Sequence, residues 1–113
     1  MATYTSKPRD VIFMGKANVP DRFVVTYKKL GSGESTIHFY GTAQDGTKAD
    51  LMSGGTADTL AGEQGHYDAQ IVKVVLSDVV SFWYVLTGAE NVQVSDIQLV
   101  TKQQIPITAN LNT

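Results

Sequence analysis

Apolar and polar side chains alternate along most of this 113-residue chain, and this period of two limits the fold more than any other sequence feature. Successive side chains of a β-strand point to opposite faces, whereas the apolar residues of an amphipathic helix recur every three or four positions. In residues 22–29, for example, Phe23, Val25 and Tyr27 share one face. The same pattern recurs in three further runs, at residues 35–41, 70–76 and 79–87. The sequence therefore predicts strands, each with one side facing a core.

The run 79–87 is apolar on both faces of its predicted strand. One face carries Val80, Phe82, Tyr84 and Leu86, and the other carries Val79, Ser81, Trp83, Val85 and Thr87. A strand with one face in water would alternate with polar residues on that face. We therefore expect this strand to lie centrally in its sheet, with cover on both sides.

The alternation slips by one position in residues 91–100. Val92 and Val94 share a face, but Ile97 and Leu99 fall one residue out of phase with them. An extra residue near Ser95-Asp96, as in a β-bulge, returns the second pair to the core. The sequence therefore predicts a bulge or bend at this place.

Glycine-rich turns separate the predicted strands, and Asp45-Gly46 predicts a hairpin into a short strand around 47–52. Only residues 56–64 suit a helical turn or two. Seven or eight short strands with this spacing predict an all-β fold, a jelly-roll β-sandwich of antiparallel strands. The expected organisation is an extended N-terminal arm at 1–10, the sandwich at 11–102 and a C-terminal tail at 103–113.

Composition suits one small folded domain and excludes several classes of protein. The apolar share is 42% and the charged share is 18%, as is ordinary for a folded domain of this length. The lack of cysteine excludes disulfides, thiolate metal sites and cysteine nucleophiles. No stretch approaches the roughly 20 apolar residues of a membrane-spanning helix, and residues 1–10 lack the apolar centre of a signal peptide. We expect a protein that neither spans a membrane nor uses Sec-type export.

Charge is divided unevenly along the chain, although the net charge is only −2. Residues 1–29 hold six cations and two acids, a net charge of +4, while residues 30–113 hold three cations and nine acids, a net charge of −6. The acidic total argues against general nucleic-acid binding. A basic front end on an acidic body suits docking onto an acidic protein surface or a neighbouring copy.

The sequence carries no recognisable catalytic or cofactor constellation. His38 and His66 are the only histidines, and they have no metal-site spacing. Ser53 and Ser77 lack the strand–elbow–helix context of a serine nucleophile. The glycine-rich pieces match neither a phosphate loop nor a dinucleotide fingerprint. We therefore expect no enzyme activity, no metal and no cofactor.

Aromatic residues give the one grouping that suggests a ligand. Trp83 must point away from its neighbours Phe82 and Tyr84 on the predicted strand, and it is a candidate centre for a sugar-stacking platform. The further platform candidates are Tyr40, His38 and Tyr67. The competing interpretation is that Trp83 lies in the core or in a subunit interface, since both faces of its strand are apolar.

The strands predicted over residues 70–100 resemble the closing strands of jelly-roll modules. The ending Val92-Gln93-Val94-Ser95-Asp96-Ile97-Gln98-Leu99 is similar to that of galactose-binding-like and carbohydrate-binding domains. The resemblance covers under a third of the chain and implies a fold, because the ligand-contacting loops of those domains have no counterpart here.

Taken whole, the chain resembles the small cement, or decoration, proteins on the heads of tailed bacteriophages. The shared features are length, lack of cysteine, a glycine-punctuated body, the Met1–Asp10 arm and the Gln103–Thr113 tail. The resemblance implies a virion structural protein that is made in the bacterial host cytoplasm. It would bind the major capsid protein on the outer capsid surface and reinforce contacts between capsid subunits. It also implies a homo-oligomer, a dimer or trimer, without direct nucleic-acid or membrane contact.

Two groups of residues are candidates for contact with the capsid. Lys7, Arg9 and Lys16 would meet acidic capsid loops, and the tail residues Ile105, Ile107 and Leu111 would add a strand to a neighbour's open sheet edge. The alternatives are a carbohydrate-binding module of a phage fibre or adhesion system, and a tail, neck or baseplate component of the same fold.

Overall fold

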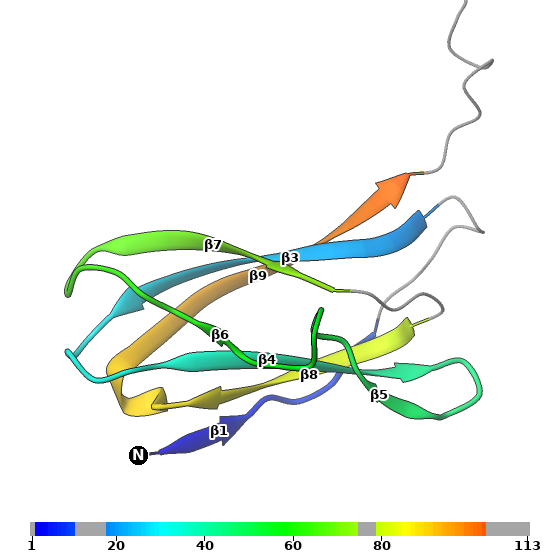
Figure 1. Ribbon diagram of the computed structural model, residues 1–113, viewed down its shortest axis with the longest axis horizontal. Coiled ribbons are helices and arrows are strands. Elements are labelled where there is room, and N and C mark those ends of the chain that lie inside the picture. The colour runs from blue at the N-terminus through cyan, green and yellow to red at the C-terminus, as the bar shows by residue number, and fades with distance from the viewer. Residues whose placement is uncertain (1, 11–17, 75–78, 104–113) are drawn as a thin grey trace, which may run out of the picture.

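The computed structural model describes residues 2–10, 18–74 and 79–103 (Figure 1). The capsid-contact candidates Lys16, Ile105, Ile107 and Leu111 lie outside these described residues. Among the described residues, no helix is long and apolar enough to cross a membrane.

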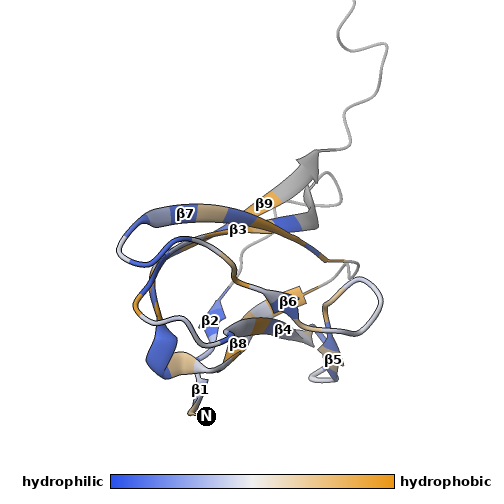
Figure 2. Ribbon diagram, turned by 60° about the vertical axis from the view of Figure 1, so that its left-hand side comes forward, coloured by the Kyte–Doolittle hydropathy of each residue, from blue (hydrophilic) through white to orange (hydrophobic). Residues whose placement is uncertain are grey.

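Two antiparallel sheets pack face to face and form a sandwich (Figures 1 and 2). The first sheet has the order β1 (Thr3–Thr5), β8 (Val79–Thr87), β4 (Thr36–Ala43) and β5 (Lys48–Asp50), with β2 (Arg9–Asp10) beside β8 and β6 (Asp58–Thr59) beside β4. The second has the order β7 (Tyr67–Lys73), β3 (Asn18–Lys29) and β9 (Val92–Gln103). One short 3₁₀ turn, Ala89–Asn91, joins β8 to β9. The prediction of an all-β sandwich is confirmed.

The core lies between the sheets, where the alternating apolar residues of β3 meet those of β4. Phe23, Val25 and Tyr27 are buried from one side, and Ile37 and Phe39 from the other. The rings of Phe23 and Phe39 stack with their centroids 3.9 Å apart. The inward faces that the period of two predicts for these strands are confirmed.

The predicted bulge near Ser95-Asp96 is also confirmed. Thr26 of β3 pairs with Asp96, but the next residue, Tyr27, pairs with Val94, so that Ser95 is the extra residue. Its hydroxyl donates to the carbonyl of Thr26 at 3.1 Å. The extra residue restores the phase of the strand, and Ile97 is buried.

The predicted phase at the start of β8 is wrong. Val80 was expected to share a covered face with Phe82, but it is 38% exposed, while Val79 and Phe82 are buried. The register of β8 shifts between Thr42 and Ala43 of β4, so that Ala43 pairs with Val79 and skips Val80. This irregularity turns Val80 outward.

Residues 56–64 contain no helical turn. Asp58 and Thr59 instead form β6, which pairs with β4 at Thr36 and Ile37. Leu60 follows as a fully buried side chain and donates its N–H to the carbonyl of Ser35 at 2.8 Å. The segment therefore covers one side of the sandwich as extended chain.

The segment expected as an N-terminal arm forms part of the first sheet over its described residues. β1 and β2 pair with β8, which places β8 between them and β4 as a central strand. Between these two short strands, Ser6 donates its N–H to the carbonyl of Tyr84 at 2.9 Å. Residues 2–10 thus serve as an edge strand of the body.

Candidate functional site

The outer face of the first sheet brings aromatic side chains together. Because Ile37 and Phe39 point into the core, the intervening His38 and Tyr40 of β4 point outward. The register sets Tyr40 directly opposite Trp83 of β8. We refer to His38, Tyr40 and Trp83 as the aromatic row. Three of the four predicted platform residues therefore lie on one face.

The rings of the aromatic row stack on one another. His38 and Tyr40 have ring centroids 4.5 Å apart and planes 12° from parallel. Tyr40 and Trp83 have centroids 5.6 Å apart and planes 18° from parallel. The ammonium of Lys48, on β5, lies 5.8 Å from the centroid of the Trp83 ring. All three rings are half-buried, because neighbouring side chains cover much of their area.

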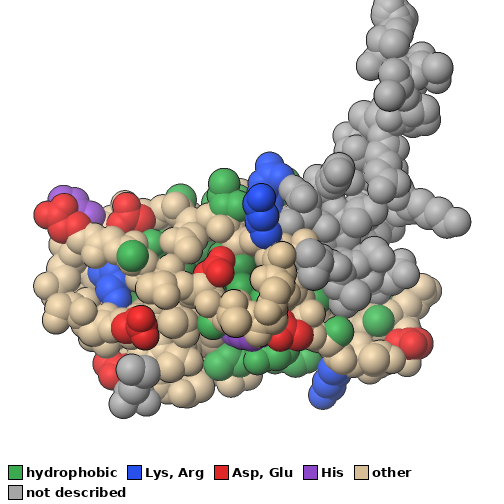
Figure 3. Space-filling view, in the orientation of Figure 1, with side chains coloured by type: hydrophobic (Ala, Val, Ile, Leu, Met, Phe, Trp, Pro, Cys, Tyr) green, Lys and Arg blue, Asp and Glu red, His purple; other side chains and the backbone are tan. Residues whose placement is uncertain are grey.

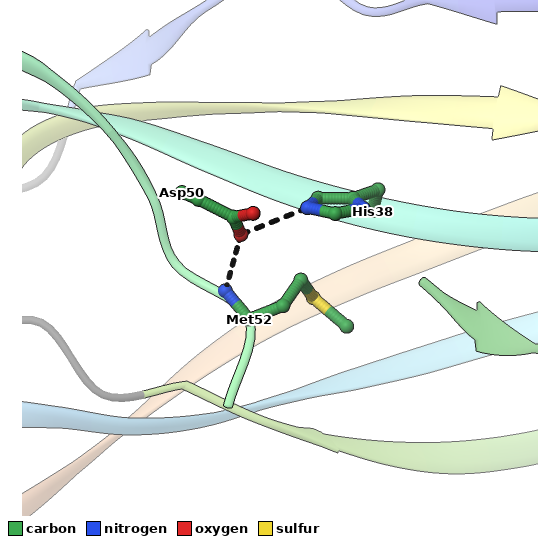
Figure 4. Close-up of polar contacts among 3 residues, drawn as sticks. All are labelled: His38, Asp50 and Met52. Carbon is green, nitrogen blue, oxygen red and sulfur yellow. Dashed lines mark hydrogen bonds and ion pairs between the residues drawn. The ribbon is translucent and has the colours of Figure 1, made fainter. Parts of the chain in front are cut away.

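Asp50 of β5 fixes the histidine end of the row (Figure 4). One of its carboxylate oxygens accepts a hydrogen bond from Nε2 of His38 at 2.8 Å and another from the backbone N–H of Met52 at 2.9 Å. A carboxylate can only accept hydrogen bonds, so the proton in this bond is carried by Nε2 of His38. The backbone bond holds the carboxylate in place, and the carboxylate in turn orients the imidazole against Tyr40.

The row lies on a broad surface that combines apolar and polar groups. Hydrophobic side chains gather along the lower edge of the molecule, beneath the β4–β8 layer and beside a histidine (Figure 3). Threonines at the outward positions of β1, β4 and β8 flank the row, and Lys48 and Asp50 border it from β5. Such a surface offers apolar area together with hydrogen-bonding groups at its margins.

The histidine–aspartate pair has no partner for catalysis among the described residues. No hydroxyl is hydrogen-bonded to His38, and the part of the chain that the structure describes holds no group of three metal-ligating side chains. A general base needs a nucleophile or substrate proton within hydrogen-bond reach. The described contacts of the pair are those that hold the imidazole against Tyr40.

Tyr67, the fourth platform candidate, lies on the other sheet. It begins β7 and pairs with Lys28 of β3, whose ammonium lies 4.8 Å from the centroid of the Tyr67 ring. The two sheets lie on opposite sides of the core, so Tyr67 cannot contribute to one surface with Trp83.

The two described basic candidates of the N-terminal segment are exposed on the edge beside β8. Arg9 donates from Nη1 to the carbonyl of Ile97 at 3.3 Å and so reaches across to β9. Lys7 lies between β1 and β2 and is exposed. Arg9 therefore has a structural contact in addition to any role toward a partner, whereas Lys7 extends from the surface.

Sequence reasoning missed a buried lysine–serine pair at one end of the sandwich. Lys29 is 5% exposed, and its ammonium donates to the carbonyl of Gly33 at 2.6 Å and to Oγ of Ser35 at 3.1 Å. Ser35 is fully buried and donates its own hydroxyl to the carbonyl of Gly88 at 2.9 Å. A lysine can activate a serine nucleophile, but no substrate reaches this hydroxyl. The pair links β3, the β3–β4 turn and the β8–β9 turn.

The alternation itself contained the signal for this pair. Lys29 falls in the same phase as Phe23, Val25 and Tyr27, so a strict period of two places it on the buried face. The burial of a lysine requires hydrogen-bond acceptors around its ammonium, and the turn residues supply them.

No protein-family model, curated protein or solved structure matches this chain. The interpretation of the aromatic row therefore depends on its own geometry.

Proposed function

We propose that this chain is a protein-binding structural module, and specifically a decoration protein that docks on the outer surface of a virion capsid. The observation that carries the proposal is the aromatic row on the outer face of the first sheet. Its partner in this role is the major capsid protein, and the copies on the particle form a homo-oligomer.

The stacking of the row favours a protein partner over a sugar. A sugar packs against the open face of an aromatic ring, but in the row Tyr40 is stacked by both His38 and Trp83. The rings are thus engaged with one another. Aromatic residues with polar tips are enriched in protein interfaces, where a rigid, pre-ordered group costs little conformational entropy on binding.

The assignment to a capsid is supported by the resemblance in size, cysteine-free composition and layout to phage decoration proteins. A protein of that kind binds at many equivalent positions, so modest contacts at each position suffice. The exposed Lys7 at the edge beside β8 and Lys48 beside the row provide positive charge for acidic capsid loops.

The test is co-sedimentation of the purified protein with decoration-free heads of the phage whose genome encodes it. We expect the wild-type protein to bind and Trp83→Ser and Tyr40→Ser to bind at least tenfold more weakly, because aromatic anchors dominate such interfaces. Leu30→Ser is the control, since Leu30 is an exposed apolar residue outside the row. Far-UV circular dichroism must show that each variant is folded. Equal binding by the Trp83 and Tyr40 variants would refute docking through this face.

A carbohydrate-binding module is the second candidate function. Its supporting observation is that Trp83, Tyr40 and His38 lie together on one sheet face. A glycan array distinguishes the two functions. Glycan retention that is lost in Trp83→Ser and kept in Tyr67→Ser, on the opposite sheet, would favour the sugar. If the protein binds a preparation of tails or necks and does not bind heads, the result would favour a tail, neck or baseplate component of the same fold.

A further inference from the structure

The strand β7 forms a border of the second sheet, with hydrogen-bonding groups that point out of the molecule. Its neighbour β3 lies on one side only. On the other side, the N–H of Ser53 donates to the carbonyl of Lys73 at 3.4 Å. Neighbouring residues of a strand direct their N–H and C=O groups to opposite edges. The backbone groups of Tyr67, Ala69 and Ile71 therefore share the direction of Lys73 and point away from β3.

This outward direction agrees with the bonds of β3 itself. The carbonyl of Lys29 accepts from the N–H of Gly65 on the β7 side at 2.8 Å, and Leu30 donates to Asn91 on the β9 side at 2.8 Å. Odd-numbered residues of β3 thus face β7, and their partners on β7 are the even-numbered ones. Among the described residues, none hydrogen-bonds to the backbone of Tyr67, Ala69 or Ile71.

The side chains along this edge are apolar and exposed. Tyr67 is 56% exposed and Ile71 is 58% exposed, and the small Ala69 lies between them on the same face. Proteins protect open edges with proline, bulges, lysines or other charged side chains. The pairing of residues 67–71 with β3 contains no bulge, and the segment contains no proline and only one charge, Asp68. The exposed Lys73 lies at the end of β7, where Ser53 already meets the edge. An open edge of this kind favours the addition of another strand.

We propose that a second copy of this chain supplies that strand, through antiparallel pairing of β7 with β7 about a two-fold axis at Ala69. In this register, Ala69 faces Ala69, and Tyr67 of each copy faces Ile71 of the other. All three pairs use backbone groups that point out of the edge. An aromatic residue opposite a β-branched one is a favourable cross-strand pair. In this register the two exposed apolar side chains, Tyr67 and Ile71, pack against each other at two symmetry-related places. The β7–β3–β9 sheets of the two copies then form one continuous sheet.

The surroundings of the edge select this register. A two-fold axis at Gln70 would set Lys73 opposite Tyr67, but the Met52–Ser53 segment already occupies the edge at Lys73. With the axis at Ala69, pairing ends at Ile71 and avoids this segment. Asp68, the one charge within residues 67–71, then meets Gln70 of the second copy and not another Asp68.

The other border of the second sheet is less suited to this pairing. On β9, the carbonyl of Ile97, which points away from β3, accepts the guanidinium of Arg9. This contact covers part of the β9 edge. The inference rests on the homo-oligomer of the proposed function and names its interface. Its failure is distinguishable from a failure of docking, because β7 belongs to the sheet opposite the aromatic row.

Sedimentation equilibrium of the full chain, with light scattering after gel filtration, tests the proposal. We expect a dimer that Ala69→Pro converts to a monomer with an unchanged circular dichroism spectrum. Proline is tolerated at this position, because the N–H that it removes points away from β3. Ile71→Lys should raise the dimer Kd about tenfold or more, because symmetry removes two cross-strand pairs. Leu30→Lys, a matched change at a residue that is 51% exposed, should leave the Kd unchanged.

Cross-linking tests the register separately. The chain contains no cysteine, so Ala69→Cys gives a single thiol in each copy. A short bis-maleimide should join two such copies, whereas the Gln98→Cys variant, with its thiol at an exposed position on β9, should stay uncross-linked. A wild-type monomer at every concentration would overturn the proposal. A dimer that persists in Ala69→Pro, or that cross-links better in the Gln98→Cys variant than in the Ala69→Cys variant, would also overturn it.

Discussion

Removal of the Ser35 hydroxyl should destabilise the sandwich by an amount that the structure defines. Ser35 Oγ accepts one of the two described hydrogen bonds of the buried Lys29 ammonium and donates to the carbonyl of Gly88. That carbonyl keeps a second partner, the N–H of Asn91 at 3.0 Å. The loss of stability in Ser35→Ala therefore comes mainly from the Lys29 ammonium. Of its two described hydrogen bonds, this group keeps only the one to the carbonyl of Gly33.

A hydrogen bond to a charged group is worth about 1.5–3 kcal/mol, so we expect a loss of about 2 kcal/mol in the free energy of unfolding. For a domain near this size, that loss lowers Tm by roughly 8 °C. Urea denaturation followed by circular dichroism gives both the midpoint and the slope. Ser95→Ala is the matched control, because its exposed hydroxyl donates to the carbonyl of Thr26, and we expect it to cost less than about 0.5 kcal/mol.

A double-mutant cycle tests the cause of the loss. Lys29→Met removes the buried charge, and apolar replacement of a buried ionic group is often close to neutral. In the Lys29→Met background, Ser35→Ala should therefore cost clearly less than in the wild type. A Ser35→Ala variant within about 0.5 kcal/mol of the wild type would refute the reasoning, as would full additivity with Lys29→Met.

Three further predictions concern the fold. Gly88→Ala should cost about 2 kcal/mol or more in urea denaturation, because Gly88 has φ of 70° and an added Cβ would lie 2.0 Å from the carbonyl oxygen of Glu34; normal stability would contradict this. Phe23→Ala should cost about 3–5 kcal/mol, since Phe23 stacks on Phe39 in the core, and Tyr4→Ala, at an exposed ring, should cost far less. The N–H of Ala2 lowers the pKa of Glu90 from its ordinary value. The contribution of this one contact to the attachment of β1 should therefore be fully present above the ordinary pKa of glutamate and be lost as the pH falls through the lowered one; an NMR titration in which the Ala2 amide does not follow Glu90 would contradict this.

The parts of the fold that follow from local pattern could be predicted from the sequence. Phe23, Val25 and Tyr27 lie on the buried face because each faces the core in a strict period of two. The bulge at Ser95 could be found because it restores the phase between Val94 and Ile97. The Asp45-Gly46 turn also follows from local chemistry, since Asp45 accepts the N–H of Thr47 at 2.9 Å.

The parts that depend on pairing between distant segments could not be predicted. Val80 is exposed because the register with β4 slips at Ala43, and nothing within residues 79–87 signals that slip. The N-terminal segment has a polar composition, and it forms an edge strand because its backbone pairs with β8. For the candidate site, the alternation placed His38 and Tyr40 outward, but their stacking on Trp83 depends on the β4–β8 register. Tyr67 was assigned to the same platform because the sequence does not reveal which sheet a strand joins.

Trp83 is the only tryptophan of the chain, so its fluorescence reports directly on the aromatic row. The decisive measurement is acrylamide quenching of this fluorescence in the free protein and in the protein bound to heads whose own tryptophans are replaced by a non-fluorescent analogue. Docking through the outer face of the first sheet predicts a blue-shifted emission and markedly weaker quenching on binding. Binding to heads with unchanged emission and unchanged quenching would show that the partner contacts another surface.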